Sequence, residues 1–263
     1  MPNQTFTLAT TQPSQNLSIP APVAYIAEWG IVLLLVTGMS WFVNRKRSSS
    51  IPPNSATQSQ VLLGLETLQF NQPLQWVSYG KQLERSRQYL AAIAVYNRGI
   101  NQYPNDFHLW HERGLALAKL QRFEEAIASY DQAYQIRPEQ RDLAHERGDA
   151  LLQLGRYEEA IDCFDVFLRY APGNTHVLAD RGYALVQLGC YQEALRSLEA
   201  VLKGNRWERT PTAYARYYQI EALRQSGQLK AALQSAAIAV KQHPEERFQA
   251  QYAALKHQLD QVT

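Results

Sequence analysis

The chain has 263 residues, of which 46% are hydrophobic and 19% are charged, so most of it can fold around an apolar core. Its 26 Lys and Arg residues nearly balance its 24 Asp and Glu residues, and the small basic surplus lies in the run Arg45, Lys46 and Arg47. The rest of the chain lacks the excess of basic side chains that phosphate binding needs. This excludes nucleic-acid binding as the function of the folded part.

The first 43 residues contain neither Lys nor Arg, and Glu28 is their single acid. Residues 1–22 are rich in Thr, Gln, Pro, Ser and Asn, and we expect them to be disordered because they have few apolar side chains to bury. Residues 23–43 are apolar and carry a tryptophan towards each end. As a helix they would span about 31 Å, the thickness of a bilayer core, so the sequence predicts a transmembrane helix here.

Three alternatives compete with this interpretation. A signal peptide would need a basic segment before the apolar run and a cleavage site after it, whereas Asn-Arg-Lys-Arg follows at residues 44–47. A buried core helix would not need a polycationic end. An amphipathic surface helix would show a polar face, which residues 31–36 lack.

The basic run also predicts the orientation, because such residues stay on the cytoplasmic side of a membrane. We expect a single-pass membrane protein whose N-terminus is extracytoplasmic or lumenal and whose remaining chain is cytoplasmic. Residues 44–60 would form a basic stop and a flexible linker, and residues 61–72 a short capping helix.

From residue 73 to residue 246 the sequence repeats itself at a period of 34 residues. The repeats are residues 73–106, 107–140, 141–174, 175–208 and 213–246, and residues 247–263 form a predicted C-terminal capping helix. Glycine recurs at position 8 of a repeat, alanine at position 20 and proline at position 32: Gly80, Gly114, Gly148, Gly182, Ala92, Ala126, Ala160, Ala194, Pro104, Pro138, Pro172 and Pro244. The small residues let the two helices of a repeat approach closely, and the proline stops the second helix.

Three more positions complete the pattern. A glycine at position 15 is expected to end the first helix in a left-handed conformation. An aromatic residue at position 17 and an aromatic residue or Leu at position 24 are expected to fill the gap to the next repeat. This pattern resembles the tetratricopeptide-repeat (TPR) family. The resemblance implies an all-α solenoid of stacked helix–turn–helix units, five repeats plus a cap, after the transmembrane helix.

The sequence departs from the family pattern at the junction of repeats four and five. Arg206 stands where proline is expected, residues 209–212 are inserted, and Ile220 replaces the close-packing glycine. We expect this junction to be the least regular part of the solenoid.

In the TPR family the first helices line a concave groove, which implies a protein or peptide partner. The predicted partner-binding residues are His111, His145, Asp149, Tyr183, Tyr214, Tyr217 and Tyr218. The alternative for the tyrosines is that they fill the space left by the missing glycine at Ile220. The groove residues at position 6 are acids, namely Glu112, Glu146 and Asp180. They depart from the carboxylate clamp of chaperone-binding members, so no chaperone tail is expected. Histidines beside acids make a metal site conceivable, but solvated groove residues are favoured, and no metal or cofactor is predicted.

No Gly-rich phosphate loop, GxSxG or HExxH motif occurs, so no catalytic residue is predicted and the chain is not expected to be an enzyme. The tetrapeptide His-Glu-Arg-Gly recurs at 111–114 and 145–148 only because the repeat recurs. We interpret Arg113, Arg147 and Arg181 as structural, pairing with Asp131 or Asp165 on a neighbouring second helix.

The repeats contain the sequences Arg-Gly-x-Ala-Leu, at 113–117, 147–151 and 181–185, and Gly-Arg-Tyr-Glu-Glu-Ala-Ile, at 155–161. These sequences are similar to those of bacterial and especially cyanobacterial TPR proteins. One membrane helix before TPRs resembles the assembly factors of photosystem I. The predicted function is therefore a membrane-tethered scaffold or assembly factor for a membrane-associated partner. The alternative is a permanent structural subunit of an envelope machine such as a secretion or pilus complex.

Cys163 and Cys190 show no zinc spacing and are expected to be free thiols.

Overall fold

The computed structural model describes residues 68–204 and 209–261. The predicted tail, transmembrane helix and linker lie outside these ranges, as do residues 61–67 of the predicted capping helix; residues 68–72 are not helical. All the described helices belong to one compact unit. Within the described ranges, no helix combines the length and the apolar character that crossing a bilayer requires.

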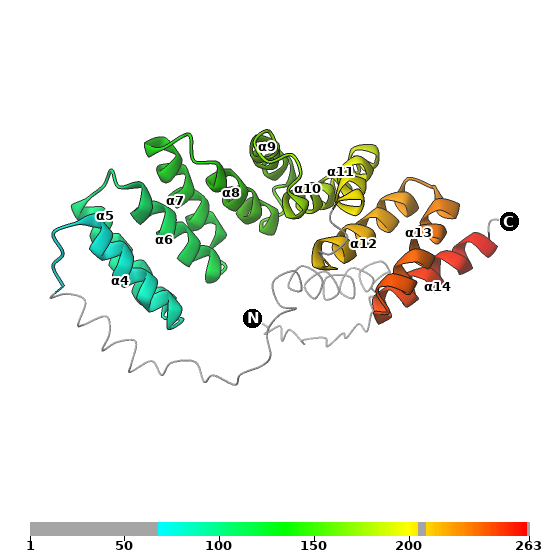
Figure 1. Ribbon diagram of the computed structural model, residues 1–263, viewed down its shortest axis with the longest axis horizontal. Coiled ribbons are helices and arrows are strands. Elements are labelled where there is room, and N and C mark those ends of the chain that lie inside the picture. The colour runs from blue at the N-terminus through cyan, green and yellow to red at the C-terminus, as the bar shows by residue number, and fades with distance from the viewer. Residues whose placement is uncertain (1–67, 205–208, 262–263) are drawn as a thin grey trace, which may run out of the picture. The chain divides into compact units, whose positions relative to one another are not determined.

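The described part of the chain is all-helical and contains no strand. Its eleven helices are α4 (Pro73–Arg85), α5 (Tyr89–Gln102), α6 (Phe107–Lys119), α7 (Phe123–Ile136), α8 (Arg141–Gln153), α9 (Tyr157–Leu168), α10 (Thr175–Gln187), α11 (Tyr191–Lys203), α12 (Arg209–Gln225), α13 (Leu229–Gln242) and α14 (Glu246–Asp260). They form five antiparallel pairs followed by α14 (Figure 1). We call α4, α6, α8, α10 and α12 the first helices, and α5, α7, α9, α11 and α13 the second helices.

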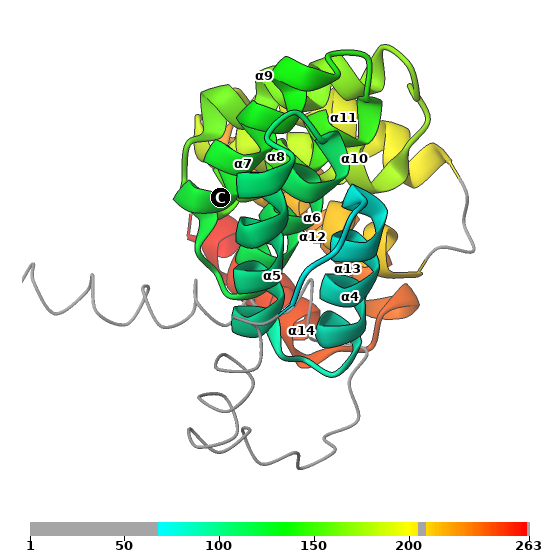
Figure 2. The same cartoon turned by 90° about the vertical axis from the view of Figure 1, so that its left-hand side faces the viewer.

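The first helices lie on the inner side of the stack. Each first helix contacts the next first helix directly, whereas consecutive second helices make at most marginal contact within the described residues. The row therefore bends towards the first helices, as Figure 1 shows. Figure 2 views the same helices from the end at which α4 lies. This bend creates one continuous inner face, built from side chains of the first helices.

Every first helix ends in the same turn. Position 15 of the repeat has a positive φ in all five repeats: Arg87 (60°), Gln121 (60°), Gly155 (72°), Gly189 (74°) and Gly227 (79°). The next residue donates its backbone N–H to the carbonyl of a leucine five residues earlier, at 2.8–3.0 Å. This is the Schellman arrangement, and it needs a left-handed residue whether or not glycine is present.

Gln121 and Arg87 hold this left-handed conformation at a cost that glycine would avoid. Gln121 is exposed, so its side chain contributes little packing. We expect Gln121→Gly to raise the free energy of unfolding by about 0.5–1 kcal/mol, after allowing for the greater freedom of glycine in the unfolded chain. Urea denaturation of residues 47–263 measures the change. The reverse substitution Gly155→Gln should lower stability by a similar amount, and a loss of stability in Gln121→Gly would contradict the assignment of this turn.

Close approach within a repeat depends on the glycine at position 8. A Cβ added to Gly80, Gly114, Gly148 or Gly182 would lie 2.2–2.6 Å from the side chain at position 24 of the same repeat, which is Tyr96, Tyr130, Phe164 or Leu198. The alanines at position 20 are fully buried between the same helices. The side chain at position 24 thus packs on the glycine of its own repeat, a contact that the sequence-based interpretation of this position did not include.

The fifth repeat reverses these sizes. Position 8 carries Ile220 and position 24 carries Ala236, and both are fully buried. The large residue has moved from the second helix to the first, so the missing glycine leaves no void. The inserted residues 209–212 extend α12, which begins at Arg209.

Arginines at position 7 tie successive repeats together. Arg147 donates from Nε to Oδ1 of Asp131 on the preceding second helix at 2.7 Å, and from Nη1 to Sγ of Cys163 on its own second helix at 3.0 Å. Arg181 makes the equivalent bonds to Asp165 (2.5 Å) and Ser197 (2.8 Å). Arg113 bonds to an amide, Asn97, and to Ser129, both at 2.6 Å. These hydrogen bonds give the three arginines a structural role. Both cysteines, Cys163 and Cys190, are free thiols.

Candidate functional site

The inner face gathers most of the residues that the sequence singled out. His111 on α6, His145 and Asp149 on α8, and Asp180 on α10 form a stretch of histidines and acids. Tyr183 on α10 and Tyr214, Tyr217 and Tyr218 on α12 form a neighbouring aromatic cluster. Both groups come from first helices, because positions 2, 5, 6 and 9 of every repeat recur on the same side.

Two interactions cross the acidic stretch from helix to helix. Lys81 of α4 pairs with Glu112 of α6, whose side chain is only 8% exposed. Nε2 of His111 lies 2.5 Å from Oε2 of Glu146 on α8. Burial lowers the pKa of His111, but the hydrogen bond and the charge of Glu146 outweigh it, so that the pKa is raised. The main role of His111 is therefore to link α6 to α8 through Glu146.

The next helices bring a histidine and two carboxylates together. Nε2 of His145 lies 3.4 Å from Oδ2 of Asp149, one turn further along α8. A carboxylate oxygen of Asp180 approaches from α10, and one ligand atom from each of the three residues lies within 4.8 Å of the others. We call His145, Asp149 and Asp180 the inner triad.

The surroundings of the inner triad disfavour charge. Burial and the negative charge of Glu146 raise the pKa of Asp149 to about 7, although 48% of its side-chain surface is still exposed on the inner face. Burial and the charge of Asp149 raise the pKa of Asp180 well above its usual value. Burial lowers the pKa of His145, which keeps the imidazole neutral. A cation placed at the triad would relieve the repulsion between the two carboxylates.

The four tyrosines form one cluster, but they differ in exposure. Tyr183 and Tyr218 are 4% and 5% exposed, with ring centroids 4.7 Å apart, so they belong to the packing between α10 and α12. Tyr214 and Tyr217 are partly exposed, and their rings lie 4.7 and 5.2 Å from Tyr218. Only these two can present much surface to a partner.

Both exposed tyrosines are held in place. The ring of Tyr217 also lies 6.4 Å from Phe248 of α14, and the guanidinium of Arg247 lies 5.9 Å from it. The cluster does not fill a void at Ile220, since Ile220 is matched by Ala236. Sequence reasoning missed Tyr157, which extends the cluster from α9 at 6.0 Å from Tyr183.

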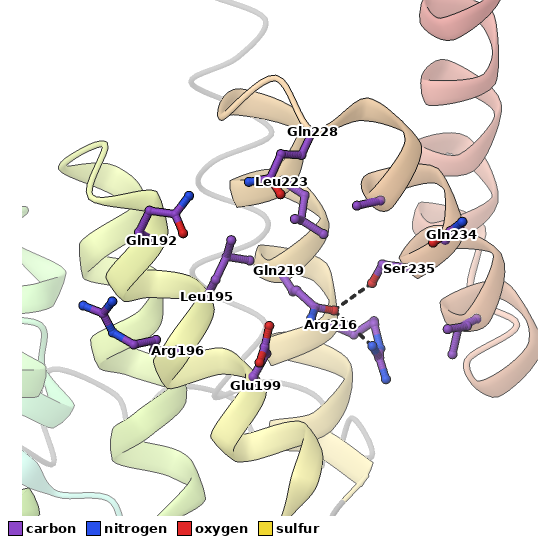
Figure 3. Close-up of a pocket in the computed structure, with 12 residues that line it drawn as sticks. Gln192, Leu195, Arg196, Glu199, Arg216, Gln219, Leu223, Gln228, Gln234 and Ser235 are labelled. Carbon is purple, nitrogen blue, oxygen red and sulfur yellow. Dashed lines mark hydrogen bonds between the residues drawn. The ribbon is translucent and has the colours of Figure 1, made fainter.

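A separate groove of about 520 Å³ opens on the other side of the stack, between α11 and α13 with α12 at its base (Figure 3). Position 7, an arginine in the three preceding repeats, is Gln219 here; it accepts a hydrogen bond from Ser235 at 2.7 Å and one from Arg216 at 3.0 Å. Glu199 lines the groove at the position of Asp165, and among the described residues its side chain pairs only with Lys203 of its own helix. Because glutamine is shorter than arginine, Gln219 does not reach across the groove to Glu199. The replacement of arginine by glutamine at this position can be recognised from the sequence alone.

Comparison with known proteins identifies the repeat. Family models described as tetratricopeptide repeat match residues 80–141, 117–179 and 179–247. No curated protein sequence matches significantly.

Several solved structures share the fold. The TPR protein YrrB, whose structure is described as having an unusual peptide-binding site, is 16% identical, with a TM-score of 0.63, over 76% of this chain and 97% of that one. A TPR protein from Parabacteroides merdae is 16% identical, with a TM-score of 0.63, over 72% and 73% of the two chains. MamA from Desulfovibrio magneticus is 14% identical, with a TM-score of 0.62, over 68% and 99%. At these identities the likeness concerns the fold alone.

Proposed function

Because the chain belongs to the tetratricopeptide-repeat family, we propose that it is a non-enzymatic scaffold that holds a segment of a partner protein against its inner face. One observation carries this proposal: Tyr214 and Tyr217 present partly exposed rings on a rigid aromatic base, beside a stretch of acids and histidines. The peptide-binding site ascribed to YrrB supports a peptide-like partner.

The physical reason lies in preorganisation. A tyrosine ring offers a large contact area and loses little rotamer entropy on binding. Tyr214 and Tyr217 lose still less, because Tyr218 and Phe248 already fix the directions of their rings. Interface energy concentrates in such anchors, so this part of the inner face is the centre of the proposed contact.

Cross-linking from opposite sides of the stack tests the proposal. A photoreactive benzoylphenylalanine at Tyr217 of the full chain, expressed in its own cells, should cross-link to one discrete partner. The control is the same probe at Tyr134, which is 53% exposed on the second helix α7. Equal products from both positions, or a product from Tyr134 alone, would contradict binding on the inner face.

We further propose that residues 23–43 tether this scaffold to a membrane, so that its partner is a membrane-associated protein undergoing assembly, as for the photosystem I assembly factors that the sequence resembles. The support is the apolar sequence followed by Arg45, Lys46 and Arg47. A tether would raise the effective concentration of the inner face near membrane-bound partners.

Fractionation tests the tether. The full chain should sediment with membranes and resist extraction by alkaline carbonate, whereas residues 47–263 alone should remain in the supernatant. Recovery of the full chain in the supernatant would overturn the tether while leaving the scaffold untouched.

A further inference from the structure

The inner triad has an arrangement suited to metal coordination. His145 and Asp149 are four residues apart on α8 and therefore lie on the same face one turn apart, a spacing that lets two side chains share an ion. Asp180 comes from α10, the next first helix, and faces them. Two helices that pack against each other thus supply one nitrogen and two oxygen ligands.

The distances fit a small divalent ion. Ligand atoms bound tetrahedrally at about 2.1 Å are about 3.4 Å apart. Nε2 of His145 and Oδ2 of Asp149 are already separated by 3.4 Å. All three ligand atoms lie within 4.8 Å of one another, and we expect the short Asp180 side chain to rotate to complete the set. His145 is fixed for this role by Phe167, whose ring centroid lies 5.4 Å away.

The charges around the triad also point to a cation. Within the described residues, the carboxylate of Asp180 has no hydrogen bond or ion pair, although the residue is partly buried where α10 packs against α8. The charged neighbours that act on the triad are Glu146 and Asp142, which are both acidic. Lys81, on the same inner face, is engaged with Glu112. No side chain of this part of the chain balances the two carboxylates.

We propose that His145, Asp149 and Asp180 bind one divalent first-row transition-metal ion, of which Zn²⁺ is the best match to one imidazole and two carboxylates. This departs from the sequence-based expectation of no metal. Three protein ligands leave at least one coordination position open towards the inner face, where water or a side chain of a partner completes the shell. The site rests on the triad's own geometry and stands whether or not the scaffold proposal holds.

Titration of the full chain, purified in detergent and stripped with a chelator, tests the site. Calorimetry with Zn²⁺ should give one ion per chain for the wild type. Asp180→Asn and His145→Gln should each weaken binding at least about 100-fold, since each removes a ligand. The matched control is Asp162→Asn, which removes an exposed acid from the second helix α9 but no ligand, and should change the affinity by less than about threefold.

Co²⁺ gives a second readout that needs no variant. Bound at the triad, it should show the intense visible absorption of a tetrahedral site, and Zn²⁺ should displace it. Absence of stoichiometric Zn²⁺ binding in the wild type would overturn the proposal. Equal affinity in folded Asp180→Asn, or a Co²⁺ spectrum typical of the hexaaqua ion, would overturn it as well.

Discussion

Gly148→Ile should destabilise the repeat unit by about 3 kcal/mol or more, and Phe164→Ala in the same chain should restore part of that loss. A Cβ at residue 148 would lie 2.6 Å from Cε1 and 2.9 Å from Cδ1 of Phe164. The ring is fully buried and cannot move aside. Phe164→Ala alone should also cost about 3–5 kcal/mol, because it leaves a cavity.

The double variant reproduces the sizes found in the fifth repeat, where Ile220 and Ala236 occupy the same two positions. Its loss should therefore be smaller than the sum of the single losses by at least about 2 kcal/mol. Denaturant unfolding of residues 47–263 gives all four values of the cycle. Gly173→Ile is the control, because nothing lies within 4 Å of a Cβ at that position. Strictly additive losses would show that positions 8 and 24 do not meet as described.

The repeat pattern predicted the fold well because it is local. Position 8, position 20 and the proline recur at fixed spacing, and each acts within one helix pair. The left-handed turn was visible at Gly155, whereas Gln121 adopts the same conformation without a glycine to reveal it. Similarly, Ile220 looked like a defect because its counterpart, Ala236, lies in another helix.

The candidate site was less predictable, because it depends on the spacing between helices. Sequence positions placed Asp149 and Asp180 on the same groove, but only the packing of α8 against α10 shows that their carboxylates approach each other. The same is true of the tyrosines. Tyr183 and Tyr218 were candidate contacts and are buried, since α10 and α12 close over them. The transmembrane helix over residues 23–43 lies outside the described residues and stays a prediction.

The second large effect is expected on binding. Tyr214→Ala and Tyr217→Ala should each weaken partner affinity by about 2 kcal/mol, about 30-fold in Kd, because each removes a preorganised anchor. Each should lower the free energy of unfolding by only about 1–2 kcal/mol, since both rings are partly exposed. Tyr183→Ala is the contrasting variant: its ring is 4% exposed, so stability should fall first and binding only as a consequence.

The affinity of the Tyr214→Ala, Tyr217→Ala double variant for the cross-linked partner tests the scaffold most directly. Calorimetric titration should be done on the full chain, with circular dichroism to establish that the variant is folded. The inner-face contact predicts a loss of about 100-fold or more, and Tyr134→Ala on the opposite side should bind as the wild type does. A folded double variant that binds its partner with unchanged Kd would contradict the central claim.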